Sequence, residues 1–309
     1  MTLFFIILIK IFPLYINVIL GFLSSKILHV QRESIAALLI YILGPIVVFS
    51  AVITVKIDFS VAILPIFLYV FCSILAFASL FIWGKSWDNP TGNILAFSAG
   101  TGNTGYFGIP LAIILFPPTL ADIYIFAVIA SLLYESSTGF YVTAKGSFSV
   151  KQSLKKISRL PILYAFILGI TFNLAGLKIP EEISAYTAQF KGAYGILGMM
   201  MLGMGLLGLK SNPDNFDKKF ISITFIIKFV FWPLAMLGFI YVDKTYLHFL
   251  NEDLYKVLFL FSIVPLAGNT VTLAVLLNAK PEKASLAVFL STLVSIIFIP
   301  LAIYLYGGF

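Results

Sequence analysis

The sequence predicts an all-helical integral membrane protein of ten transmembrane helices, on three observations. Of its 309 residues, 61% are hydrophobic and only 11% are charged, whereas a soluble domain carries roughly 25% charged residues. Apolar runs of ~20 residues, long enough to cross a hydrocarbon core of ~30 Å as helices, recur along the chain. A long basic segment divides these runs into two sets of five. A soluble domain is excluded, and a barrel, whose strands have only ~10 residues, is disfavoured.

The ten apolar runs end at charged or turn-forming residues, which locates each predicted span. We expect spans near residues 3–25, 34–54, 60–84, 90–117, 121–144, 161–176, 192–209, 220–241, 254–278 and 284–307. The first run does not resemble a cleavable signal peptide, because no basic residue precedes Lys10 and the apolar stretch is long. We therefore expect it to be the first span.

Basic residues are distributed unevenly between the predicted loops. Loops after odd-numbered spans carry thirteen lysines and arginines, and loops after even-numbered spans carry five. Because positively charged loops stay in the cytoplasm, both termini should lie on the non-cytoplasmic side of the cell (inner or plasma) membrane. The net charge of +7 is thus a topology signal and indicates no nucleic-acid partner.

Residues 145–160 form the longest polar connection and carry five of the basic residues. This predicted cytoplasmic linker separates five spans in 1–144 from five in 161–309. Because five is odd, the second set must enter the membrane in the opposite orientation. We therefore predict two inverted five-helix repeats, an arrangement found in many secondary carriers.

The fourth and ninth spans share a sequence that disfavours a continuous helix. Gly102-Asn103-Thr104 in the fourth span recurs as Gly268-Asn269-Thr270 in the ninth, with prolines close by. Glycine and proline weaken helical hydrogen bonding. If both spans unwind, their half-helix ends and asparagine amides offer donors to a carboxylate. We predict a binding site at Asn103, Thr104, Asn269 and Thr270, flanked by the crossover residues Gly102, Pro110, Pro265 and Gly268.

A plainer interpretation stays open for these spans. Glycine and proline also kink packed helices, and asparagine amides also bond between helices without binding a ligand. The same arrangement in corresponding spans of two halves favours the binding site.

Residues 102–110, GNTGYFGIP, resemble the signature of the auxin efflux carrier family, which includes bacterial malate and malonate permeases and the plant PIN-FORMED carriers. Residues 265–293 resemble the C-terminal end of that family, and the resemblance covers essentially the whole chain. It implies the fold of the sodium/proton antiporters, with broken spans four and nine crossing. It also implies that Asn103 and Asn269 contact a substrate carboxylate. The large cytoplasmic domain of the plant carriers has no counterpart in 145–160.

The resemblance implies a secondary active transporter for small organic anions such as carboxylates, with elevator-like alternating access in the lipid bilayer. Spans 3–5 and 8–10 would form the moving transport core. Spans 1, 2, 6 and 7 would form the scaffold and a homodimer contact. One alternative is a sodium-coupled symporter resembling the bile-acid carriers, but no acidic sodium ligands are evident near the crossover. The other is a signalling or anchoring membrane protein, which the retention of both asparagines disfavours.

Two ionisable residues lie deep in predicted spans, Glu135 in the fifth and Lys228 in the eighth. Burying a charge there costs roughly 2.5–3.5 kcal/mol, so both should face the protein interior. We expect Glu135 to bind the coupling ion, a proton rather than sodium, and Lys228 to be its counter-charge or to attract the anion. A fixed structural pair is the alternative. Tyr141, one or two turns beyond Glu135, is a further candidate for the cavity lining.

Other residue patterns exclude further classes of protein. Cys72 is the single cysteine, and the two histidines fall in predicted loops, so no metal site is expected. The sequence has no Gly-x-x-x-x-Gly-Lys loop and no evident Ser/His/Asp set, so we predict neither enzymatic activity nor a cofactor. The glycine-rich seventh span predicts a close packing or dimer face.

Overall fold

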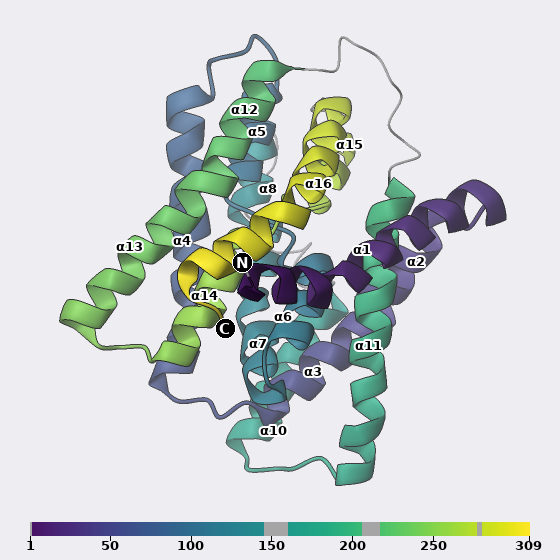
Figure 1. Ribbon diagram of the computed structural model, residues 1–309, viewed down its shortest axis with the longest axis vertical. Helices are drawn as coiled ribbons and strands as arrows, with labels where there is room; N and C mark the ends of the chain where they lie inside the picture. The colour runs from purple at the N-terminus through teal and green to yellow at the C-terminus, as the bar shows by residue number, and fades with distance from the viewer. Residues whose placement is uncertain (1, 145–159, 206–216, 277–279) are drawn as a thin grey trace.

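The protein is all-helical in a computed structural model that describes residues 2–144, 160–205, 217–276 and 280–309 (Figure 1). Its elements, with η for a π-helical turn, are α1 (Thr2–Leu28), α2 (Arg32–Leu38), η1 (Leu39–Leu43), α3 (Gly44–Thr54), α4 (Phe59–Trp83), α5 (Thr91–Ala99), η2 (Thr104–Gly108), α6 (Ile109–Leu115), α7 (Pro118–Ser136), α8 (Thr138–Ala144), α10 (Pro161–Leu174), α11 (Glu181–Met204), α12 (Lys218–Ile226), η5 (Ile227–Phe231), α13 (Trp232–Val242), η6 (Asp243–Leu247), α14 (Glu252–Ile263), α15 (Asn269–Leu276) and α16 (Pro281–Tyr306).

Six helical segments of the described chain are long and apolar enough to cross a membrane. They are Leu3–Leu28, Arg32–Thr54, Phe59–Trp83, Pro118–Thr143, Lys218–Leu247 and Pro281–Tyr306. These segments coincide with the predicted spans one, two, three, five, eight and ten, and they support a multi-pass membrane protein.

Within the described residues, the other four predicted spans do not form long apolar helices, and the ends of spans seven and nine, from residues 206 and 277, lie outside those residues. The sixth corresponds to α10, a shorter apolar helix. The seventh corresponds to α11, which begins earlier than predicted because Pro180 precedes it and two glutamates favour its first turn. The fourth and ninth are each divided into shorter helices. The linker lies outside the described residues apart from Leu160.

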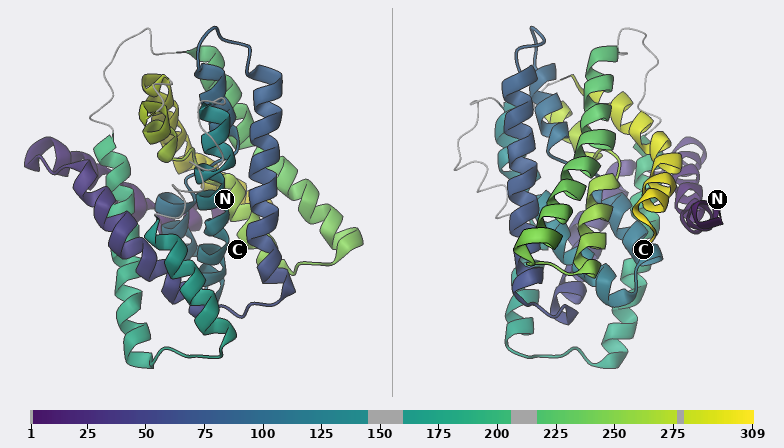
Figure 2. Two further views of the ribbon diagram at one scale, coloured as in Figure 1. Left: turned by 180° about the vertical axis from the view of Figure 1, so that it is seen from behind. Right: turned by 60° about the vertical axis from the view of Figure 1, so that its left-hand side comes forward.

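For description, we take α1–α3, α10 and α11 as one group of helices and α4–α8 and α12–α16 as the other (Figure 2). In one group α1 packs on α11, and α3 packs on α10 and α11. In the other, α4 packs on α5 and α7, α13 packs on α14, and α15 packs on α16. The groups meet where α1 contacts α16, α3 contacts α7, and α11 contacts η2 and α6. A continuous set of buried apolar side chains runs through both groups.

The contact between α1 and α11 requires glycine on both helices. A Cβ on Gly21 would lie 1.9 Å from the Met200 carbonyl oxygen, and one on Gly203 would lie 1.8 Å from that of Val18. Only glycine allows such close backbone approach. The predicted glycine-rich face therefore packs within the chain, and a dimer contact through the same span stays a prediction.

Candidate functional site

Two helix interruptions meet inside the molecule. Helix α5 ends at Ala99, and residues 100–103 are not helical before η2 begins. Helix α14 ends at Ile263, and residues 264–268 are not helical before α15 begins. The backbone N–H of Asn103 donates to the Pro265 carbonyl at 2.8 Å and so joins the two interruptions. Pro110 lies outside them, in the first turn of α6.

Close contacts explain Gly102 in the first interruption and Gly108 at the end of η2. A Cβ on Gly102 would lie 2.5 Å from Lys228 Nζ, and one on Gly108 would lie 2.0 Å from the Tyr124 hydroxyl oxygen. Both distances are too short for a larger side chain without displacement of its neighbour. Gly268 has more room, since its nearest neighbour would be 3.8 Å away.

Side chains from neighbouring helices bind the carbonyl groups that the interruption of α5 exposes. Trp232 Nε1 donates to the Ala99 carbonyl at 2.8 Å, and the Tyr134 hydroxyl donates to the Phe97 carbonyl at 3.0 Å. Non-helical backbone at membrane depth must find such partners in the protein or in water. These contacts therefore stabilise the end of α5 where it is.

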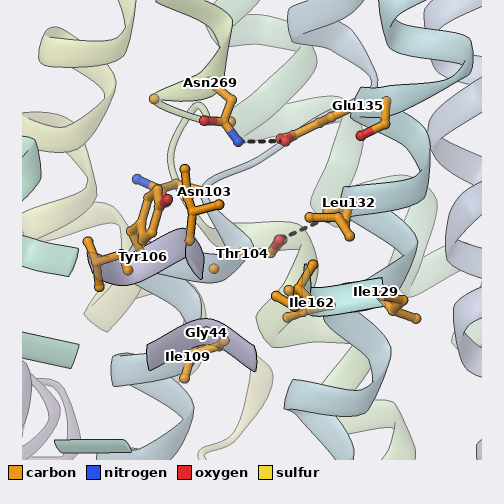
Figure 3. A pocket seen from close by; sticks show the side chains of 18 of the residues that line it. Gly44, Asn103, Thr104, Tyr106, Ile109, Ile129, Leu132, Glu135, Ile162 and Asn269 are labelled. Carbon is orange, nitrogen blue, oxygen red and sulfur yellow. Dashed lines mark hydrogen bonds between the residues drawn. The ribbon is translucent and has the colours of Figure 1, made fainter. Parts of the chain in front are cut away.

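A cavity of about 270 Å³ borders both interruptions (Figure 3). Asn103, Thr104, Asn269 and Glu135 line one part of it. The remaining wall is largely apolar and includes Gly44, Ile109, Ile129, Leu132 and Ile162. The cavity thus combines a polar part at the helix interruptions with an apolar part between the two groups of helices.

The Glu135 carboxylate contacts both interruptions. Its Oε1 accepts a hydrogen bond from Thr101 Oγ1 at 2.8 Å, and its Oε2 accepts one from Asn269 Nδ2 at 2.7 Å. Asn269 is exposed to the cavity, whereas Asn103 is 4% exposed. One carboxylate therefore accepts hydrogen bonds from both interruptions, at the place where they meet, which we call the crossing.

Three buried polar groups near the crossing have no hydrogen-bond partner within the described residues. They are Asn103 Nδ2, Lys228 Nζ and Thr270 Oγ1. Lys228 is fully buried, and its ammonium lies 3.6 Å from the ring centroid of Trp232, a cation–π contact. Buried donors without a partner are costly, so Asn103 Nδ2, which belongs to a residue that lines the cavity, is a candidate for binding a ligand.

The structure brings only some of the predicted site residues together. Asn103, Thr104 and Asn269 line one cavity with Glu135, whereas Thr270 and Lys228 lie behind its wall. Lys228 forms no ion pair with Glu135 in the part of the chain that the structure describes. Tyr141 is not a lining residue, because its side chain is 46% exposed and packs near Phe77.

Sequence reasoning missed several contributors to the site. Thr104 Oγ1 donates to Ser131 Oγ at 2.8 Å, and Ser131 also lines the cavity. Ser131 lies four residues before Glu135 on α7, and Trp232 lies four residues after Lys228. Spacing by four places each pair on one helix face, which is the signal that could have identified them.

A second polar cluster lies on the other half of α7. The Asp122 carboxylate forms an ion pair with Lys191 of α11 and accepts a hydrogen bond from Thr54 Oγ1 of α3 at 2.9 Å. The side chains of Lys191 and Asp122 are only 20% and 10% exposed. Along the helix, Asp122 lies roughly 20 Å from Glu135. The cluster therefore joins the two groups of helices away from the cavity.

These features define a multi-pass membrane protein with an internal cavity between two interrupted helices. The chain belongs to the membrane transport protein family, the family of the auxin efflux carriers, whose sequence model matches residues 145–303, more than half of the chain. This confirms the resemblance and identifies a membrane transporter. The matched region contains the second interruption, while residues 102–110 lie outside it. A comparison with curated proteins gives no match.

Proposed function

We propose that the protein is a secondary carrier for small organic anions that binds the substrate carboxylate where the two interruptions meet. Family membership supports transport. The anionic substrate is inferred from the Asn103 amide. Its Nδ2 is buried and has no hydrogen-bond partner among the described residues, and Asn103 lines the cavity.

The cavity suits an anion with an apolar body. A carboxylate at the crossing would accept hydrogen bonds from Asn103 Nδ2 and Asn269 Nδ2. The Lys228 ammonium, immediately behind Gly102, adds positive charge without entering the cavity. The apolar wall opposite would hold the organic part of the substrate.

Glu135 couples a proton to the anion in this proposal. The ionised carboxylate of Glu135 occupies Asn269 Nδ2 and so competes with the substrate carboxylate for the same donor. Protonation of Glu135 weakens that bond and removes a negative charge beside the anion. Proton and anion binding therefore favour each other. A proton suits the site better than sodium, since Glu135 carries the only carboxylate among the described residues that line the cavity.

We further propose ten spans in two inverted repeats, with α5–η2–α6 as the fourth span and α14–α15 as the ninth. The group with α4–α8 and α12–α16 is the moving core, and α1–α3, α10 and α11 form the scaffold. Both termini lie outside the cytoplasm in this arrangement. The cavity reaches Leu160, beside the cytoplasmic linker, whereas the Asp122 cluster closes the outer side. The conformation therefore faces the cytoplasm.

Substrate binding after Asn103→Ala tests the proposal. A thermal-shift screen of mono- and dicarboxylates on purified protein identifies a ligand. Loss of one charge-assisted hydrogen bond, worth roughly 1.5–3 kcal/mol, should weaken its affinity about ten- to a hundredfold.

Tyr141→Phe is the matched control, because that side chain lies away from the cavity, and it should bind like the parent. Unchanged affinity and transport in Asn103→Ala proteoliposomes would place the anion site elsewhere. A screen in which no carboxylate stabilises the protein would count against the substrate class.

A further inference from the structure

A second cavity, of about 630 Å³, lies between α1 and α11 on one side and α15 and α16 on the other. Its wall is mostly aliphatic and aromatic. Three of its lining residues, Ile19, Val275 and Leu293, are 58%, 61% and 47% exposed. Two of these lie in helices long and apolar enough to cross a membrane. The cavity therefore opens on a surface that lipid chains cover.

One cation lines this apolar cavity. Arg32 lies at the start of α2. Its guanidinium group lies near Gly205, at the C-terminal end of α11, and near Gly268, at the end of the second interruption. A Cβ on Gly205 would lie 3.4 Å from Arg32 Cζ, and one on Gly268 would lie 4.0 Å from Arg32 Nη2. Between the described residues, Arg32 makes neither a hydrogen bond nor an ion pair. No described residue therefore occupies its five N–H donors.

The chemistry of Arg32 selects the kind of acceptor. Guanidinium is permanently charged and matches the oxygen spacing of phosphate and carboxylate groups through paired hydrogen bonds. Lys26 Nζ lies 5.5 Å from the ring centroid of Phe22, which lines the cavity, but Lys26 itself does not line it. Glu282 lies at the exposed rim and does not neutralise Arg32 by an ion pair.

We propose that this cavity binds an anionic phospholipid, with the headgroup phosphate on Arg32 and an acyl chain along the apolar wall. Charge complementarity at Arg32 selects the anion. The aliphatic lining and its opening toward lipid select a molecule with a long hydrocarbon chain over a small soluble anion. This inference does not depend on the proposed substrate of the other cavity.

The position of the lipid has a consequence for conformational change. It would lie between α1 and α11 on one side and α15 and α16 on the other, and its phosphate would be close to the interruption at Gly268. A bound lipid would therefore stabilise the arrangement of α15 and α16 against α1 and α11. It would raise the thermal stability of this conformation by mass action.

The test measures lipid binding on delipidated protein in detergent. Phosphatidylglycerol and phosphatidylcholine with the same acyl chains are added separately, and thermal stability and native mass spectra are recorded. We expect phosphatidylglycerol to raise Tm by several degrees more than phosphatidylcholine and to remain bound in the spectra. Arg32→Gln should abolish this difference, whereas Lys85→Gln, at an exposed lysine remote from the cavity, should retain it.

Two further experiments distinguish lipid binding in the cavity from simple attraction of the lipid to surface charge. Ser285→Phe fills the cavity and leaves Arg32 in place, so it should also lose retention of phosphatidylglycerol. Inorganic phosphate at the same concentration should give no shift. The proposal is overturned if phosphatidylglycerol still stabilises Arg32→Gln, if it still binds Ser285→Phe, or if inorganic phosphate reproduces the effect.

Discussion

Individual polar side chains at the crossing differ in whether they have hydrogen-bond partners within the protein. Thr101 and Asn269 both donate to Glu135, and Thr104 bonds to Ser131. Asn103 Nδ2 and Lys228 Nζ have no such partner in the described part of the chain. Unsatisfied buried donors lower stability, and a ligand that accepts a hydrogen bond from Asn103 Nδ2, at the cavity wall, would offset this cost.

Glu135→Gln tests the coupling role at this scale. Glutamine mimics the protonated acid in charge, so the variant should exchange substrate across a membrane but should not accumulate it in response to a pH gradient. Proteoliposomes with an imposed pH gradient measure both activities. Gradient-driven accumulation by Glu135→Gln would rule out the coupling assignment, and loss of exchange as well would indicate a role in substrate binding.

At the scale of single elements, the structure interrupts two helices, at residues 100–103 and 264–268, whereas two broken spans that cross in the membrane stay a prediction. Glycine, proline and asparagine stand out in an apolar run, so residues 102–110 and 265–270 could be identified. Tyr124 and Tyr134 could not, because a buried aromatic and a lipid-facing aromatic look alike in sequence. Only the packing of other helices against α5 and η2 makes them hydrogen-bond donors.

Gly108→Ala should destabilise the protein because its Cβ would meet the Tyr124 hydroxyl oxygen at 2.0 Å. Overpacking of this kind costs about 1–3 kcal/mol, which thermal unfolding in detergent can detect. Adding Tyr124→Phe removes the clashing oxygen and should restore part of the loss. Gly238→Ala is the control, since nothing lies within 4 Å of that Cβ. Equal effects at both glycines would contradict the close-contact explanation.

The start of α12 provides a pH-dependent contact outside the spans. Asp217 accepts hydrogen bonds from the Phe220 backbone, from Trp87 Nε1 and, at 2.6 Å, from Lys283 Nζ. Partial burial acts to raise the pKa of Asp217, but the hydrogen bond from Lys283 and those from Phe220 and Trp87 hold it below its ordinary value. The stabilisation is therefore fully present above the unfolded-state pKa of ~3.9 and is lost as pH falls through the lower folded-state pKa.

Asp217→Asn should keep the helix cap but lose the ion pair with Lys283. We expect a loss of about 1 kcal/mol near neutral pH and a smaller dependence of Tm on pH at the acid end. Asp58→Asn is a matched control, because Asp58 caps α4 through Val61 without an ion pair between described residues. A variant of Asp217 with the parent's stability and acid dependence would show that the ion pair contributes nothing.

For the whole molecule, composition was enough to predict a multi-pass helical membrane protein, and motif resemblance was enough to predict its family. The length of α11 and the partners of each interruption depend on contacts between distant segments and were not predictable. The Asp122 cluster shows why: Thr54, Asp122 and Lys191 lie near the ends of three separate predicted spans, where charged residues are ordinary. Their meeting follows only from how α3, α7 and α11 pack.

That cluster leads to the last prediction, on alternating access. In the proposed cycle the core, which includes α7, moves relative to α3 and α11, so the contacts of Asp122 with Lys191 and Thr54 must break. Lys191→Met together with Asp122→Asn removes the ion pair without leaving a buried unpaired charge. Each ~1.4 kcal/mol of lost stabilisation would shift the equilibrium tenfold toward the outward-facing state.

A reporter cysteine at Ile129, in the cavity wall, can measure this shift in protein whose buried Cys72 is replaced by alanine. An impermeant thiol reagent added outside intact cells should label the reporter slowly in the parent and at least several-fold faster in the double variant. Lys178→Met removes an exposed lysine on the same predicted side and should leave the rate unchanged. Equal labelling of parent and double variant would mean that the cluster does not hold the outer side closed. Faster labelling of the parent from outside than from the cytoplasm would instead reverse the proposed orientation.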